Sequence, residues 1–190
     1  GESLEQKTGV REICLVLVSG KANIKTCNES WGNLGERLSI FDSKYFTECK
    51  PPYAVYVPNN DESVVEALTD LELAVCSAPG LGNFPARLIT PKDMTNETRG
   101  YGTNTRHVCN ILPENSDADN LLVVEVITPN GNWSSYPPHK HEADKLPLES
   151  ALEETYYHRL NPSQGFAFQR VYTDDLSLDE TMTVLDKDVV

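Results

Sequence analysis

Short apolar runs separated by turn residues constrain this 190-residue chain more than any other feature. They are rich in β-branched, aliphatic and aromatic side chains, and Gly, Pro, Asn or Ser lies beside most of them, which is typical of β-strands. The runs are residues 13–18, 53–57, 71–75, 121–127, 166–172 and 181–184. No segment has a helical stripe of ten or more residues, and residues 62–68 allow at most one helical turn. We therefore expect an all-β fold made of sandwich or barrel modules.

The runs fall into two clusters separated by a polar stretch at residues 92–110. We predict an N-terminal module at residues 1–90, a connecting segment at 91–115 and a C-terminal module at 116–190. The first of these modules contains no histidine. The chain begins without Met and stops inside an expected strand, whose backbone groups would be left unpaired at an edge. We expect a fragment of a longer protein, with the second module incomplete.

The charge balance excludes some classes of partner. With 16 basic and 29 acidic residues, the formal net charge is -13, which argues against nucleic acid and anionic membranes. The five cysteines have no CxxC spacing, the start has no signal peptide, and no apolar stretch approaches a membrane span. We predict a cytoplasmic protein with reduced thiols.

Three of the four histidines lie in one window, residues 139–158. His139 and His141 are one residue apart, so on a strand both side chains would point to the same face. Two imidazoles and a carboxylate from a neighbouring strand can hold a divalent metal ion. The prolines at 137–138 would stiffen the approach to the pair. A histidine pair in the core or on the surface, without metal, is the alternative.

A carboxylate ligand is expected from the segment that follows. Glu154 is the predicted ligand, and Glu153 is the alternative if the strand register shifts by one residue. In an extended segment, Tyr156 and His158 would share the face of Glu154, where they could orient a substrate or transfer a proton. Core packing is the alternative for Tyr156.

Three arginines are candidate contacts for a negatively charged substrate. Arg170 lies on the next expected strand, and Arg99 and Arg106 lie in a polar stretch punctuated by glycines. A guanidinium binds a carboxylate through two parallel hydrogen bonds. The residues therefore suit a small carboxylic acid, and a solvent-facing arginine is the alternative at each position.

Several long strings carry a family resemblance. Two lie in the second half, TPNGNWSSYPPHKH at residues 128–141 and EETYYHRLNPSQGFAFQRVYTDD at 153–175. Three lie earlier, REICLVLVSG at 11–20, KPPYAVYVP at 50–58 and ETRGYGTNTRH at 97–107. Together with the HxH pair, the following Glu and the short strands, they resemble the cupin superfamily. Within it, nearly the whole chain resembles the 5-deoxy-glucuronate isomerase family.

The resemblance implies a bicupin fold with metal in the C-terminal barrel. His139, His141 and Glu154 would be three ligands, and a fourth, a histidine on a later strand, would follow residue 190. The implied activity is an aldose–ketose isomerisation of 5-deoxy-D-glucuronate to 2-deoxy-5-keto-D-gluconate in myo-inositol catabolism, through an enediolate stabilised by a divalent metal. Zinc or manganese suits this reaction, with iron as the alternative.

Two other functions remain open at this stage. Two histidines and a carboxylate also form the facial triad of non-haem iron oxygenases, and a cupin can bind a sugar without turning it over. For the isomerase, the proton-transfer candidates are Glu153, Tyr156 and His158, and the sequence does not rank them. The expected partner is a small sugar acid, and a homo-oligomer is compatible with the sequence.

Overall fold

The computed structural model describes residues 1–42 and 50–190, which contain thirteen β-strands, one short 3-10 helix and no α-helix. The all-β expectation is therefore confirmed for the described residues. They form two compact units, residues 1–134 and 135–190, and each unit is described by itself below. The division at residues 90 and 115 stays a prediction.

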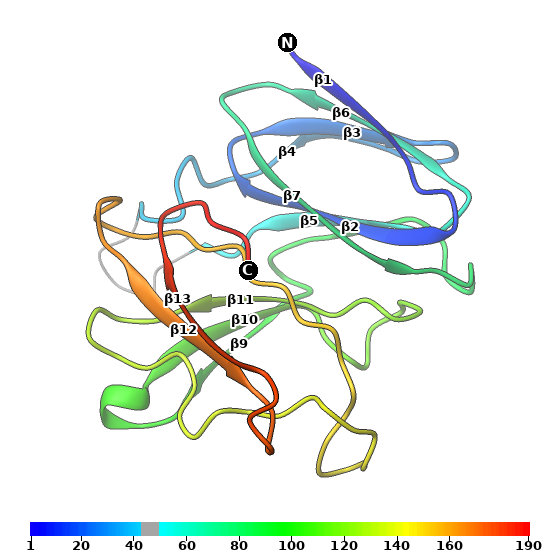
Figure 1. Ribbon diagram of the computed structural model, residues 1–190. Helices are drawn as coiled ribbons and strands as arrows, with labels where there is room; N and C mark the ends of the chain where they lie inside the picture. Colours follow the sequence, from blue (N-terminus) through cyan, green and yellow to red (C-terminus); the bar gives the residue numbers. More distant parts are fainter. Residues whose placement is uncertain (43–49) are drawn as a thin grey trace. The chain divides into compact units, whose positions relative to one another are not determined.

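Two four-stranded sheets form a sandwich in the first unit (Figure 1). One sheet has the order β1-β6-β3-β4, with strands Ser3–Lys7 (β1), Ala22–Thr26 (β3), Ser30–Leu34 (β4) and Glu62–Ala67 (β6). The other has the order β7-β2-β5-β8, with strands Arg11–Ser19 (β2), Tyr53–Val57 (β5), Glu72–Pro79 (β7) and Arg87–Ile89 (β8). Buried side chains from both sheets make one cluster between them, so this cluster is the core of the sandwich.

Strand β2 is buried on both of its faces, which explains why it reads as a continuous apolar run. Ile13, Leu15 and Leu17 enter the sandwich core. The alternate residues Cys14 and Val16 enter a second cluster on the other side of the strand. Successive side chains of a strand point to opposite faces, so a strand covered on both sides has no polar alternation.

The second cluster joins the sheet of β2 to a three-stranded sheet in the same unit. This sheet has the order β11-β10-β9, with strands Thr95–Arg99 (β9), Arg106–Leu112 (β10) and Val123–Ile127 (β11). Ile111 and Leu112 of β10 are buried in the cluster. The helix η2 (Gly102–Asn104) lies in the connection between β9 and β10.

A buried ion pair ties the three-stranded sheet to the segment after β4. Arg37 is 4% exposed and donates to both carboxylate oxygens of Glu125, at 2.9 and 2.5 Å. It also donates to the carbonyl oxygens of Val18 and Lys50. The buried guanidinium therefore has hydrogen bonds to a carboxylate and two carbonyls, which offset the cost of its desolvation.

The second unit contains one two-stranded sheet, formed by Ala167–Tyr172 (β12) and Asp179–Val184 (β13). An isolated antiparallel bridge also joins Tyr157 to Val189. Among residues 135–190, all of which the structure describes, Val184 is the one buried residue. Side-chain burial therefore orders this unit far less than it orders the first.

The structure differs from the sequence-based expectations at residues 62–68 and adds detail at residues 91–115. Residues 62–68 do not form a helical turn, because β6 lies there and pairs with both β1 and β3. Its burial alternates, with Ser63 and Val65 inward, as expected of a half-buried strand. The expected connecting segment 91–115 contains β9, η2 and β10.

The described residues include four of the five cysteines. Four cysteines there are free thiols: Cys14 and Cys109 are buried, Cys76 is half-buried and Cys27 is exposed. Cys49 lies outside the described residues. Within the described part of the chain, no helix is both long and apolar enough to cross a membrane.

Candidate metal centre

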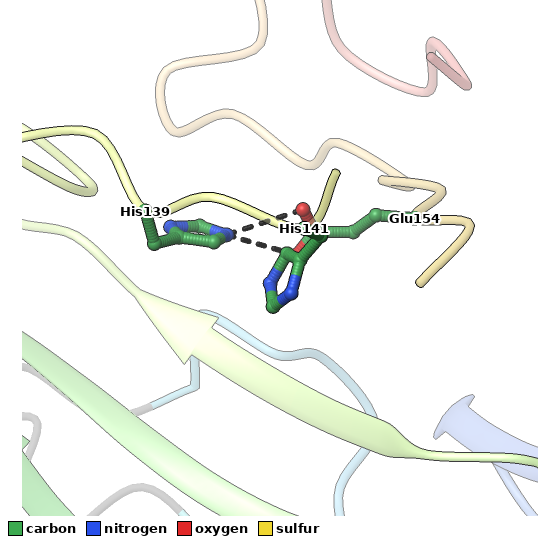
Figure 2. Close-up of side chains that lie close together, drawn as sticks. All are labelled: His139, His141 and Glu154. Carbon is green, nitrogen blue, oxygen red and sulfur yellow. Dashed lines mark hydrogen bonds and ion pairs between the residues drawn. The ribbon is translucent and has the colours of Figure 1, made fainter. Parts of the chain in front are cut away.

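His139, His141 and Glu154 converge in the second unit (Figure 2). Each offers one ligand atom, and the three atoms lie within 4.8 Å of one another. Glu154 and His139 are about two-fifths exposed, and His141 is half-buried. The three residues that sequence spacing singled out as ligands are thus brought together.

The strands expected to carry these residues are not present. Residues 139–141 and 151–156 have no regular secondary structure, so the expectation that the HxH pair lies on a strand is wrong. Hydrogen bonds close the intervening loop instead. The Glu149 carboxylate accepts from the backbone N–H groups of Glu142 and Ala143, at 2.8 Å each, and the N–H of Leu152 donates to the carbonyl of His141. The loop therefore returns Glu154 to the histidines.

Each ring nitrogen of His139 has a polar neighbour. Nε2 lies 3.2 and 3.1 Å from the two carboxylate oxygens of Glu154. Nδ1 lies 3.0 Å from Oγ of Ser135. Nε2 therefore faces the shared centre, and Nδ1 faces away from it.

The hydrogen bond of His141 indicates the tautomer of its neutral ring. Its Nδ1 lies 3.1 Å from the carbonyl oxygen of Ser150, and a carbonyl oxygen can only accept a hydrogen bond. Nδ1 must carry the proton, which leaves the lone pair on Nε2 for a metal. The two imidazole rings are 4.9 Å apart between centroids and meet edge to face.

The donor set fits a divalent metal ion. Imidazole nitrogen and carboxylate oxygen are ligands for zinc, manganese and iron in proteins. Two atoms that bind one ion at about 2.0–2.2 Å each lie at most about 4.4 Å apart. A small rotation of one side chain would therefore let all three residues reach one ion.

Tyr156 lies beside the three candidate ligands. Its hydroxyl is 3.4 Å from Nε2 of His139. Burial, and then a hydrogen bond to Glu154, raises the pKa of Tyr156 above its usual range. The phenol therefore keeps its proton at neutral pH and can donate a hydrogen bond at the centre.

The C-terminal residues hold the segment that carries Tyr156 and His158. The backbone N–H of Tyr156 donates to Val190 at 2.8 Å and that of His158 donates to Asp188 at 2.8 Å. The rings of Tyr156 and His158 are stacked, with 6.0 Å between centroids, so both lie on one side of the segment. Nε2 of His158 lies 3.1 Å from Oε1 of Gln169. Glu153 is exposed next to Glu154.

The candidate substrate arginines have partners within the chain. Arg170 makes two hydrogen bonds to Asp179, at 2.7 and 2.9 Å, from β12 to β13. In the first unit, Arg99 donates to the carboxylate of Glu97. Arg106 donates to the neutral carbonyl of Asn104 at 3.2 Å. A carboxylic acid would thus compete with an acidic side chain at Arg170 and Arg99.

Sequence reasoning missed three residues that contact the HxH segment. Ser135 and Ser150 contact the imidazoles, and Asp174 binds the ammonium of Lys140. Hydrogen bonds to Asp174 and then Glu142 raise the pKa of Lys140. No spacing signal marks these contacts, because each joins residues that only the folded loops bring together.

Comparisons with known proteins agree with this architecture. A family model described as the KduI/IolB family matches residues 1–190. The chain is 59% identical to the 5-deoxy-glucuronate isomerase of Geobacillus thermodenitrificans, and the aligned region covers all of this chain and 67% of that protein. The isomerase of the same name from Bacillus subtilis strain 168 is 48% identical, with 100% and 68% covered.

A solved structure is also similar along the whole chain. A crystal structure of an IolB-like protein from Salmonella typhimurium LT2 matches with a TM-score of 0.93 and 53% sequence identity. The match covers 100% of this chain and 70% of that protein. The predicted fold class, an all-β bicupin, is confirmed.

Proposed function

The chain belongs to the KduI/IolB family, and from that premise we propose that it isomerises 5-deoxy-D-glucuronate to 2-deoxy-5-keto-D-gluconate in myo-inositol catabolism. The observation that carries the proposal is the convergence of His139, His141 and Glu154 within 4.8 Å. It occurs in a chain whose relatives, at 46–59% identity, bear the name 5-deoxy-glucuronate isomerase. The substrate is a small sugar acid.

His139, His141 and Glu154 would hold one divalent ion. Bound there, the ion supplies a Lewis acid that stabilises negative charge on substrate oxygens. Zinc or manganese suits a reaction without net oxidation, and iron is the alternative. The Ser150 carbonyl supports this assignment, because it keeps Nε2 of His141 available as the ligand atom.

The isomerisation moves a proton between adjacent carbons, so it needs a group that accepts a proton and a group that returns one. Glu153 and His158 can accept a proton. A hydrogen bond from Nε2–H of His158 to Gln169 would leave Nδ1 as the accepting atom. Tyr156 is the third candidate, and its raised pKa favours a hydroxyl that keeps its proton. It would donate a hydrogen bond to an oxygen that gains negative charge.

The substrate carboxylate would be bound by an arginine. Arg170, Arg99 and Arg106 are the candidates, and the fork of a guanidinium matches a carboxylate. The guanidinium of Arg170 already binds one carboxylate, that of Asp179, through two hydrogen bonds. At Arg106, a substrate carboxylate would displace no acidic side chain, because the contact is with the carbonyl of Asn104.

The test is turnover of 5-deoxy-D-glucuronate by the native full-length protein, with oxygen uptake measured in parallel. We expect the ketose acid to form without oxygen consumption, and His139→Ala to abolish turnover. The matched control is His107→Ala, since His107 is the one histidine outside residues 139–158 and contacts Thr98 in the first unit. Full activity of His139→Ala would contradict the metal-centred mechanism. Oxygen uptake would favour the oxygenase, and binding without turnover would favour a sugar-binding cupin.

A further inference from the structure

We propose that Ser135 is a positioning residue that fixes the tautomer of His139 and so makes Nε2 the metal-binding atom. The inference rests on the proposed function only through the metal site, and it does not depend on the substrate. Ser135 precedes the HxH pair by four residues and is half-buried.

The direction of the hydrogen bonds follows from a chain of three groups. Oγ of Ser135 lies 3.3 Å from the carbonyl oxygen of Pro137 and 3.0 Å from Nδ1 of His139. A carbonyl oxygen only accepts, and a serine hydroxyl has a single proton to donate. When that proton goes to Pro137, Oγ can only accept from His139. Nδ1 then carries a proton, and the lone pair for a metal lies on Nε2.

On the other side of the ring, Nε2 of His139 is the atom directed at Glu154, at 3.1 and 3.2 Å (Figure 2). A carboxylate only accepts, so a hydrogen bond between the two needs a proton on Nε2. An ion bound by Nε2 would take the place of that proton, and the neutral ring would then keep its proton on Nδ1. His141 has the same arrangement, with Nδ1 directed at the carbonyl of Ser150. Both histidines would thus present Nε2, one fixed by a hydroxyl and the other by the backbone. The hydroxyl is the partner that a substitution can remove.

This role differs from support of the fold. Ser135 lies outside every strand, in a loop, and its side chain contacts the ring of His139 and a carbonyl two residues away. Loss of the hydroxyl should leave the strands unchanged and release the imidazole to rotate or to change tautomer. Partners of this kind typically contribute about 10–100-fold to metal affinity.

The experiment compares Ser135→Ala with two controls. Ser134→Ala removes the hydroxyl of the neighbouring serine, and Ser135→Thr keeps a hydroxyl at position 135. Zinc affinity is measured by competition with a chelator, and the Nδ1 proton of His139 is followed by NMR in the zinc-loaded protein. We expect Ser135→Ala to bind zinc about 10–100-fold more weakly and to lose the slowly exchanging Nδ1 proton. Ser134→Ala should match the native protein, and Ser135→Thr should recover most of the affinity.

The outcomes separate this inference from the proposed function. Native affinity and an unchanged Nδ1 proton in Ser135→Ala would overturn the inference, even if the protein isomerises its substrate. The expected loss in a protein that binds zinc but has no isomerase activity would support the inference and count against the proposed function. A loss of equal size in Ser134→Ala would also overturn it, because the effect would not belong to Ser135.

Discussion

The two units of this chain are ordered by different interactions. Residues 1–134 hold two buried clusters, one on each face of β2. In residues 135–190, all of which are described, Val184 is the one buried residue. The large side chain of Phe168 is 71% exposed. The candidate ligands all belong to this second unit, where hydrogen bonds and ion pairs shape the loops. A site of this kind gains order from a bound ion, because metal binding is coupled to the structure of its ligands.

The buried ion pair of the first unit offers the largest expected effect on stability. Glu125→Leu removes the carboxylate that pairs with Arg37 and leaves its guanidinium buried without that counter-charge. Breaking a buried pair in this way typically costs about 3–5 kcal/mol. Urea denaturation of the variant and the native protein measures the change in the free energy of unfolding. A loss below about 1 kcal/mol would show that this pair does not stabilise the unit.

A pair of apolar substitutions compares the two units directly. Leu15→Ala empties a fully buried position in the sandwich core, and such changes cost about 2–5 kcal/mol. Phe168→Ala, at the exposed position in β12, should change the free energy of unfolding by no more than about 0.5 kcal/mol. The same denaturation measurement applies to both. Equal costs would mean that side-chain burial does not distinguish the units.

An expected cost smaller than those of Glu125→Leu and Leu15→Ala lies in the second unit and depends on pH. Asp186 accepts from the N–H of Leu160 and from Nε of Arg159, and these contacts lower its pKa. A carboxyl with a lowered folded-state pKa contributes stability above its unfolded pKa, and this contribution is lost as pH falls through the folded value. Asp186→Asn should therefore cost about 1 kcal/mol at neutral pH.

The cost of Asp186→Asn should shrink below about pH 4, where the aspartate begins to be protonated in the unfolded chain. Thermal unfolding at several pH values measures it, with Glu180→Gln, at an exposed position of β13, as the control. A cost that stays constant down to about pH 2 would show that the ionised carboxylate is not its source.

The strands that the sequence revealed are those with strong local signals. Residues 13–18 and 53–57 read as strands because they are continuous apolar runs, and they form β2 and β5. The strand β9 has the sequence TNETR and is exposed along its length, so nothing local marks it. It exists through its pairing with β10. The strand β6 is also hard to recognise from its sequence. Its glutamates at 62 and 66 lie outside the buried face, and their spacing of four residues resembles a helical pattern.

The sequence predicted which residues form the candidate site, but not which backbone elements bring them together. The HxH spacing and the following glutamate identified three side chains that do converge. The reason given for their convergence, two neighbouring strands, was wrong, because closed loops bring them together. Contacts such as Ser135 with His139 depend on loop conformation, which side-chain periodicity does not encode.

The central claim is that His139, His141 and Glu154 together hold one divalent ion. Its most direct test is metal analysis of the full-length protein after zinc loading and dialysis, for the native protein, His141→Ala, Glu154→Gln and the control His107→Ala. We predict one equivalent of zinc per chain in the native protein and the control. His141→Ala and Glu154→Gln should each retain far less than one equivalent, since each removes a ligand. A full equivalent of zinc in both ligand variants would contradict the account.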